Sequence, residues 1–136
     1  MKKLILYTLI IVTTFLFSGC KKNQALDVVS SRDIVDDNRK ITTLYIVADM
    51  NKFRDYTICS KNIISHCLKN DFDNIKFSYD VEGYPSEIVS YVYSSQLNYE
   101  TNPPVFKMIY TIKNNTYSSY NIKDNTNDYT YEIISY

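Results

Sequence analysis

Glycine is scarce in this chain, since only two of its 136 residues are glycine. Phosphate-binding loops and dinucleotide fingerprints each need several glycines for tight turns and close backbone approach. The composition therefore excludes a locally assembled nucleotide site. Histidine occurs once, as His66. A single histidine falls short of the four closely spaced ligands of structural zinc, so we expect no metal and no cofactor.

The chain also lacks an excess of charge of either sign, because 15 basic side chains balance 15 acidic ones. Surfaces that bind nucleic acid or anionic lipid head groups need an excess of Lys and Arg. We expect no nucleic-acid partner. Long apolar runs are missing too: residues 4–17 are apolar, but a helix across a bilayer needs about 20 such residues.

The first 20 residues have the organisation of an export signal. Lys2 and Lys3 precede the apolar stretch, which ends in the sequence Leu-Phe-Ser-Gly-Cys at residues 16–20. This segment resembles the lipobox of bacterial lipoproteins. The resemblance implies that residues 1–19 are cleaved and that Cys20 carries the acyl chains that hold the protein on a membrane. The competing interpretation is an uncleaved signal anchor with an incidental cysteine.

The residues after Cys20 refine this prediction. Lys21 stands where an aspartate would favour the inner membrane, so the resemblance implies the outer membrane, with a periplasmic or surface location. The run Cys-Lys-Lys is similar to lipoproteins of the Bacteroidetes type. Residues 20–40 are polar and lack a clear period, which predicts a flexible tether, or a short helix near residues 31–38.

Residues 41–136 are predicted to form one α+β domain. The 14 tyrosines and 6 phenylalanines of the chain favour strands. We expect an antiparallel β-meander of five to six strands in sequence order, with one helical segment at about residues 51–70 packed on one face. The expected strands cover residues 41–48, 75–82, 87–99, 106–112, 116–123 and 129–136.

One turn in this meander resembles a known repeat. Residues 77–89 read Phe-Ser-Tyr-Asp-Val-Glu-Gly-Tyr-Pro-Ser-Glu-Ile-Val. They are similar to a single copy of the tyrosine-aspartate hairpin repeat of large secreted bacterial proteins. The resemblance implies a hairpin at residues 83–86 and has almost no functional weight.

Cys59 and Cys67 remain as an even pair in an oxidising compartment, which predicts a disulfide. On one continuous helix, however, eight residues rise about 12 Å, beyond the roughly 7 Å between bridged α-carbons. Either the helix is broken between Ile58 and Asn62 or the thiols are free.

His66 could serve as a general base only with a nucleophile and an orienting carboxylate, which the linear sequence does not supply. We expect it to be a solvent-facing helix residue. Asp71 with Asp73 is interpreted as a turn, and Asp36 with Asp37 as part of the solvated tether. No catalytic residue is assigned, and the chain is predicted not to be an enzyme.

The tyrosines offer the one candidate binding surface. Tyrosine combines a large apolar ring with a polar tip and is enriched at interfaces. The competing interpretation places half of the tyrosines in the inner layer of the sheet. The candidates are Tyr91, Tyr93 and Tyr99 on one strand face, with Tyr117, Tyr129 and Tyr131 on neighbouring strands.

The sequence thus predicts a membrane-anchored envelope protein with a non-catalytic binding or scaffolding role. The partner is either an envelope protein or a glycan. Two alternatives stay open: an accessory lipoprotein of an envelope secretion machine, and a small envelope hydrolase or enzyme inhibitor.

Overall fold

The computed structural model describes residues 25–37, 39–114 and 120–136. They form one sheet with three α-helices and a 3₁₀ turn. The strands are β1 (Leu26–Asp36), β2 (Arg39–Ala48), β3 (Glu87–Tyr93), β4 (Phe106–Ile112) and β5 (Tyr129–Ser135). The helices are α2 (Tyr56–Lys69), α3 (Tyr79–Glu82) and α4 (Gln96–Thr101), with the 3₁₀ turn η1 at Thr126–Asp128.

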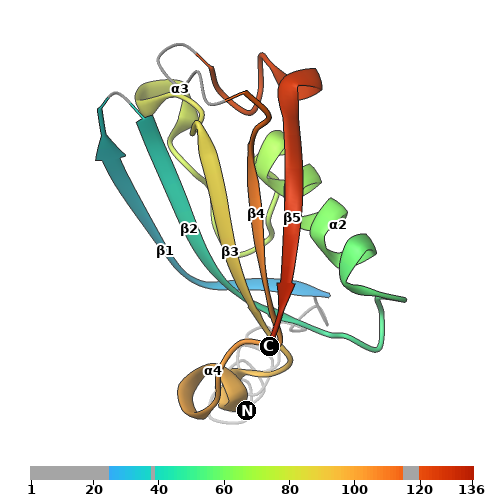
Figure 1. The fold of residues 1–136 in the computed structure, drawn as a ribbon. Coiled ribbons are helices and arrows are strands. Elements are labelled where there is room, and N and C mark those ends of the chain that lie inside the picture. The colour runs from blue at the N-terminus through green and yellow to red at the C-terminus, as the bar shows by residue number, and fades with distance from the viewer. Residues whose placement is uncertain (1–24, 38, 115–119) are drawn as a thin grey trace, which may run out of the picture.

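The five strands are neighbours in sequence order, β1-β2-β3-β4-β5. This confirms the predicted α+β sheet with a helix on one face. One pair differs from an antiparallel meander, because β2 and β3 are parallel. The cause is α2, which returns the chain along the sheet between these two strands, as parallel connections require. Figure 1 shows α2 against one face, with α3 and α4 near opposite ends of the sheet.

The hydrophobic core lies between α2 and this face. Alternate residues of β2, β3 and β4 are buried, among them Leu44, Ile88 and Met108. Helix α2 adds side chains at three- and four-residue spacing, including Ile63 and Cys67. None of the helices in the described part of the chain is long and apolar enough to cross a membrane.

The predicted tether over residues 20–40 is wrong for Leu26–Asp36, which form the edge strand β1. Leu26 and Val28 are buried, while Ser30–Asp36 are exposed on both faces. That exposure explains the missing period in the sequence, because alternation arises only where one face is covered. A register shift between Val28 and Ser30 interrupts the ladder, and Figure 1 shows the strand bending along its length.

The strand predicted at residues 75–82, and with it the predicted hairpin, is also wrong. The side chain of Asn70 accepts a hydrogen bond from the Phe77 N–H at 2.8 Å and donates one to the Phe77 carbonyl at 2.7 Å. These bonds occupy the backbone groups that a sheet ladder would need. The ring of Tyr79, in α3, packs against Phe77 and Tyr84 instead of a neighbouring strand.

Two further strand predictions need correction. The strand predicted over residues 87–99 ends at Tyr93, because Ser95 caps helix α4 by accepting a hydrogen bond from the Asn98 N–H at 3.1 Å. Of the strand predicted over residues 116–123, the described residues 120–123 are irregular.

The predicted disulfide is absent. Cys59 and Cys67 are both free and buried, and both lie on the continuous helix α2. Because the helix is unbroken between them, its rise keeps the sulfur atoms apart. Burial raises the pKa of the Cys59 thiol to about 12 and raises that of Cys67 further. These thiols therefore belong to the apolar core.

Candidate functional site

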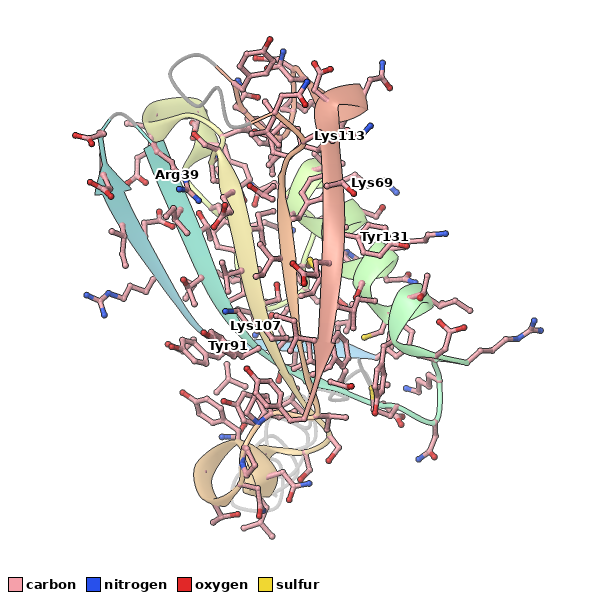
Figure 2. All side chains as sticks on the ribbon, viewed as in Figure 1. Arg39, Lys69, Tyr91, Lys107, Lys113 and Tyr131 are labelled. Atoms are coloured by element: carbon pink, nitrogen blue, oxygen red, sulfur yellow. The ribbon has the colours of Figure 1, made fainter. Side chains whose placement is uncertain are left out.

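The sheet face opposite α2 is the main candidate site. Figure 2 shows Tyr91 and Lys107 projecting on this side, whereas Tyr131 projects toward the side of α2. Partly exposed side chains from three strands line the face, including Val89 and Ile109. The face is thus a mixed apolar and polar surface, and no helix of the described residues covers it.

Strand register brings a row of three side chains together at its centre. The parallel pairing sets Tyr45 opposite Tyr91, and their rings stack with centroids 5.4 Å apart. The antiparallel pairing sets Lys107 opposite Tyr91, and its Nζ lies 5.3 Å from the ring centroid. A cation over an aromatic ring at this distance is attracted by about 0.5–1 kcal/mol at an exposed site.

Helix α4 extends this row at one end. Its Tyr99 packs against Tyr45 at 6.1 Å and meets Tyr93 edge-on at 5.2 Å. Burial is the main cause that raises the pKa of the Tyr93 phenol. Smaller contributions come from the neighbouring Tyr45, Tyr99, Tyr91 and Tyr136. The Tyr93 phenol is therefore neutral near pH 7. We call the set Tyr45, Tyr91, Tyr93, Tyr99 and Lys107 the tyrosine face.

A polar cluster joins β2, β3 and β4 farther along the same side. Glu87 is only 8% exposed, and its carboxylate accepts hydrogen bonds from Arg39 and from Thr111 Oγ1, the latter at 2.7 Å. Each of the three residues comes from a different strand. Arg39 is also labelled in Figure 2. This cluster holds the three strands in register beside the tyrosine face.

The predicted tyrosines do not form one surface. Tyr91 and Tyr93 share the open face, and Tyr99 reaches it from α4. Tyr129 and Tyr131 lie on the other face, where Tyr129 contacts Tyr110 with ring centroids 5.1 Å apart. Tyr117 lies outside the described residues, as do the signal-peptide and lipidation predictions that end at Cys20.

Sequence reasoning missed Tyr45 and Lys107. Their strands were predicted, but neither residue was assigned to the candidate binding surface. The available signal was the alternation of Tyr45 with the fully buried Leu44 and Ile46. What the sequence did not supply was the parallel register that sets Tyr45 beside Tyr91.

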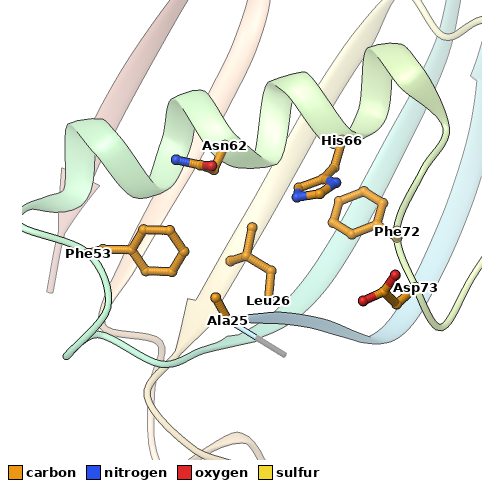
Figure 3. A pocket seen from close by; sticks show the side chains of 7 residues that line it. All are labelled: Ala25, Leu26, Phe53, Asn62, His66, Phe72 and Asp73. Carbon is orange, nitrogen blue, oxygen red and sulfur yellow. The ribbon is translucent and has the colours of Figure 1, made fainter. Parts of the chain in front are cut away.

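A second candidate lies between α2 and the start of β1. It is a small pocket of about 120 Å³, shown in Figure 3. Ligand sites for drug-sized molecules are larger, about 300–1,000 Å³. Its lining residues are Ala25, Leu26, Phe53, Asn62, His66, Phe72 and Asp73.

His66 is the chemically notable residue of this pocket. Its Nδ1 lies 2.6 Å from Asp71 Oδ1, so the chain does supply the orienting carboxylate that the linear sequence did not reveal. Asn70, with φ of 53°, ends α2 and turns the chain so that Asp71 returns to the ring. Among the described residues, no Ser, Thr or Cys lines the pocket. The pair could therefore orient a water molecule, but no described nucleophile lies beside it in the pocket.

Metal binding has no support in the described ranges. Within residues 25–37, 39–114 and 120–136, no group of three or more His, Cys, Asp or Glu side chains is placed to hold an ion. Two carboxylates accompany His66 at this pocket: Asp71 contacts its ring, and Asp73 is among the lining residues.

Comparisons with known proteins do not assign this fold to a group. No protein-family model matches the chain, and searches of curated proteins and of solved structures find no match.

Proposed function

We propose that this chain is a lipid-anchored protein of the bacterial cell envelope that binds a partner protein through its tyrosine face and catalyses no reaction. The anchor is the acylated Cys20 expected from the lipobox-like segment. Lys21 favours the outer membrane. The binding role follows from the surface on the side of the sheet away from α2.

The observation that carries the binding proposal is the central row of Tyr45, Tyr91 and Lys107. Three strands align these side chains, and each ring stays partly exposed. Aromatic residues in such a setting offer contact area that is already ordered, because stacking restricts their rotamers before a partner arrives.

A protein partner fits this surface better than a glycan. Partly exposed apolar residues, Val89 and Ile109, lie next to the tyrosines, and the exposed Thr130 and Glu132 lie toward the edge on β5. An apolar and aromatic centre with a polar rim is typical of protein interfaces. The pocket at His66 lies on the other side of the sheet.

The anchor is tested by replacing Cys20 with Ser. We expect loss of metabolic labelling with a fatty acid and release of the protein from the membrane fraction. Retained labelling of the variant would refute the anchor. Wild-type protein treated in parallel controls for expression.

The surface is tested by charge reversal and affinity purification from intact cells after crosslinking. Lys107→Glu removes the cation over Tyr91 and places a negative charge at the centre of the face. We expect it to abolish recovery of a partner protein. Lys113→Glu is the matched control, because Lys113 follows β4 and is exposed beyond the face. Equal recovery with both variants would contradict the proposal, as would glycan recovered in place of protein.

The His66–Asp71 pair supports a second candidate function, that of a small envelope hydrolase. An oriented imidazole beside a pocket can activate water as a general base. The test is a panel of glycan and peptide substrates offered to wild-type protein, His66→Ala and Asp71→Asn. Turnover that disappears in both variants would establish this alternative. Absence of turnover in the wild-type protein would remove it.

A further inference from the structure

The outer edge of β1 is closed over only part of its length. At Val28 the side chain of Asn74 imitates a neighbouring strand: its Oδ1 accepts from the Val28 N–H at 3.3 Å, and its Nδ2 donates to the Val28 carbonyl at 2.6 Å. Beyond this point β2 is the only strand beside β1 in the described part of the chain. Residues 30–36 therefore present an open edge.

This open segment carries exposed apolar side chains. Ile34 is 42% exposed and Val35 is 73% exposed, among the most exposed large apolar residues of the described chain. Open strand edges are usually blunted against pairing with another chain, often by charges or bulges. Two apolar residues at such an edge therefore point to a partner strand.

Two opposite charges on the same segment, Arg32 and Asp36, have no side-chain partner among the described residues, whereas Asp33 contacts Thr42 and Lys40. Apart from their backbone pairing in the ladder, the side chains of Arg32 and Asp36 make no hydrogen bond or ion pair with another described residue. Arg32 lies opposite Thr43 and Asp36 opposite Arg39 in the β1–β2 ladder. Both side chains therefore share one face of the strand with Ile34, which lies midway between them.

Symmetry selects one register for pairing with a second copy. An antiparallel pair related by a two-fold axis through residue n sets residue n + k opposite residue n − k of the other chain. A centre at Arg32 or at Asp33 would set like charges directly opposite. Only a centre at Ile34 sets Arg32 opposite Asp36, and the symmetry produces this contact twice.

We propose that a second copy of this chain pairs antiparallel with β1 over residues 32–36, centred on Ile34. The two Ile34 side chains meet at the axis, flanked on each side by an Arg32–Asp36 contact. Opposite charges across a strand pair stabilise it, and backbone hydrogen bonds close the open edge.

The position of this segment leaves room for the second copy. Residues 32–36 lie at the end of the β1–β2 hairpin, and Figure 1 shows this end turned away from α2. With antiparallel pairing, the remainder of each sheet extends in the opposite direction from the axis. A two-fold axis perpendicular to the sheet leaves the open faces of both copies on the same side of the joined sheet. The two open faces therefore become continuous.

Cysteine crosslinking of the full-length chain in detergent tests the register. Opposed residues in a strand pair have β-carbons about 4.5–5.5 Å apart, close enough for a disulfide after slight adjustment. We expect Ile34→Cys to give a covalent dimer on mild oxidation. Thr130→Cys, exposed on the opposite edge strand β5, is the matched control and should give none.

Charge reversal tests the chemistry. Arg32→Asp or Asp36→Arg alone sets like charges opposite each other, and we expect either to weaken self-association about tenfold in sedimentation equilibrium, given the usual strength of cross-strand pairs. The double variant restores opposite charges and should recover the wild-type constant. A monomer at every concentration, equal crosslinking of Thr130→Cys, or no recovery in the double variant would overturn the proposal. Circular dichroism verifies that each variant is folded.

Discussion

Tyr129 links the sheet to the loop before β3 through a buried phenol. Its side chain donates a hydrogen bond to the Ser86 carbonyl at 2.8 Å, and the residue is 6% exposed. Burial, with smaller contributions from Tyr110 and Glu87, raises the pKa of this phenol to about 12, although Arg39 acts in the opposite direction. We therefore predict that Tyr129 makes the fold sensitive to alkali.

The sign and size of the effect follow from proton linkage. An unfolded tyrosine loses its proton near pH 10 and the folded one near pH 12, so between these values the folded protein binds more protons. The free energy of unfolding therefore falls as pH rises through this window and is unaffected well below pH 10. The loss is about 1.4 kcal/mol at pH 11 and reaches at most about 2.7 kcal/mol above pH 12.

Replacement of Tyr129 by Phe isolates this contribution from those of other groups. The variant loses one hydrogen bond to a buried carbonyl, so at pH 8 we expect it to be about 1 kcal/mol less stable than the wild type. It also lacks the ionisable phenol, so this difference should vanish by pH 11. Urea unfolding followed by circular dichroism at both pH values measures it. The same difference at both pH values would refute the reasoning.

Three further experiments test the core, the start of α2 and the edge of the sheet. Cys59 and Cys67 should react with iodoacetamide at pH 8 at least about a thousandfold more slowly than a free cysteine, with full reactivity in urea; fast labelling would mean that the thiols are accessible. Asp55→Ala removes the α2 N-cap and should lower the free energy of unfolding by about 1 kcal/mol, whereas Asp55→Ser should keep most of it. Asn74→Ala removes both hydrogen bonds to Val28 and should speed amide hydrogen exchange at the start of β1; unchanged exchange would contradict this edge closure.

The elements that were predicted correctly from sequence are those that bury one face against the core. Strands β2 and β4 bury every second residue, and α2 buries residues at three- and four-residue spacing, so their patterns are visible in the chain. Strand β1 has no such pattern, because Ser30–Asp36 are exposed on both faces. Its partner, not its own sequence, determines its conformation.

The candidate site depended on contacts between distant residues. Tyr91 and Tyr93 were predicted from alternation, but Tyr45 joins them only because β2 and β3 are parallel. Residues 75–82 alternate as a strand would, yet the Asn70 side chain forms hydrogen bonds with the backbone N–H and carbonyl of Phe77. Neither the register nor this hydrogen-bonded loop can be read from a local period.

Site-specific photocrosslinking in intact cells tests the binding role of the tyrosine face most directly. A photoreactive phenylalanine analogue replaces Tyr91 on the open face or Tyr131 on the face of α2; both are partly exposed strand tyrosines, and Figure 2 shows them on opposite sides. We predict a discrete crosslinked partner protein from position 91 and none from position 131. Equal crosslinking at both positions, or none at position 91, would contradict a binding role for the tyrosine face.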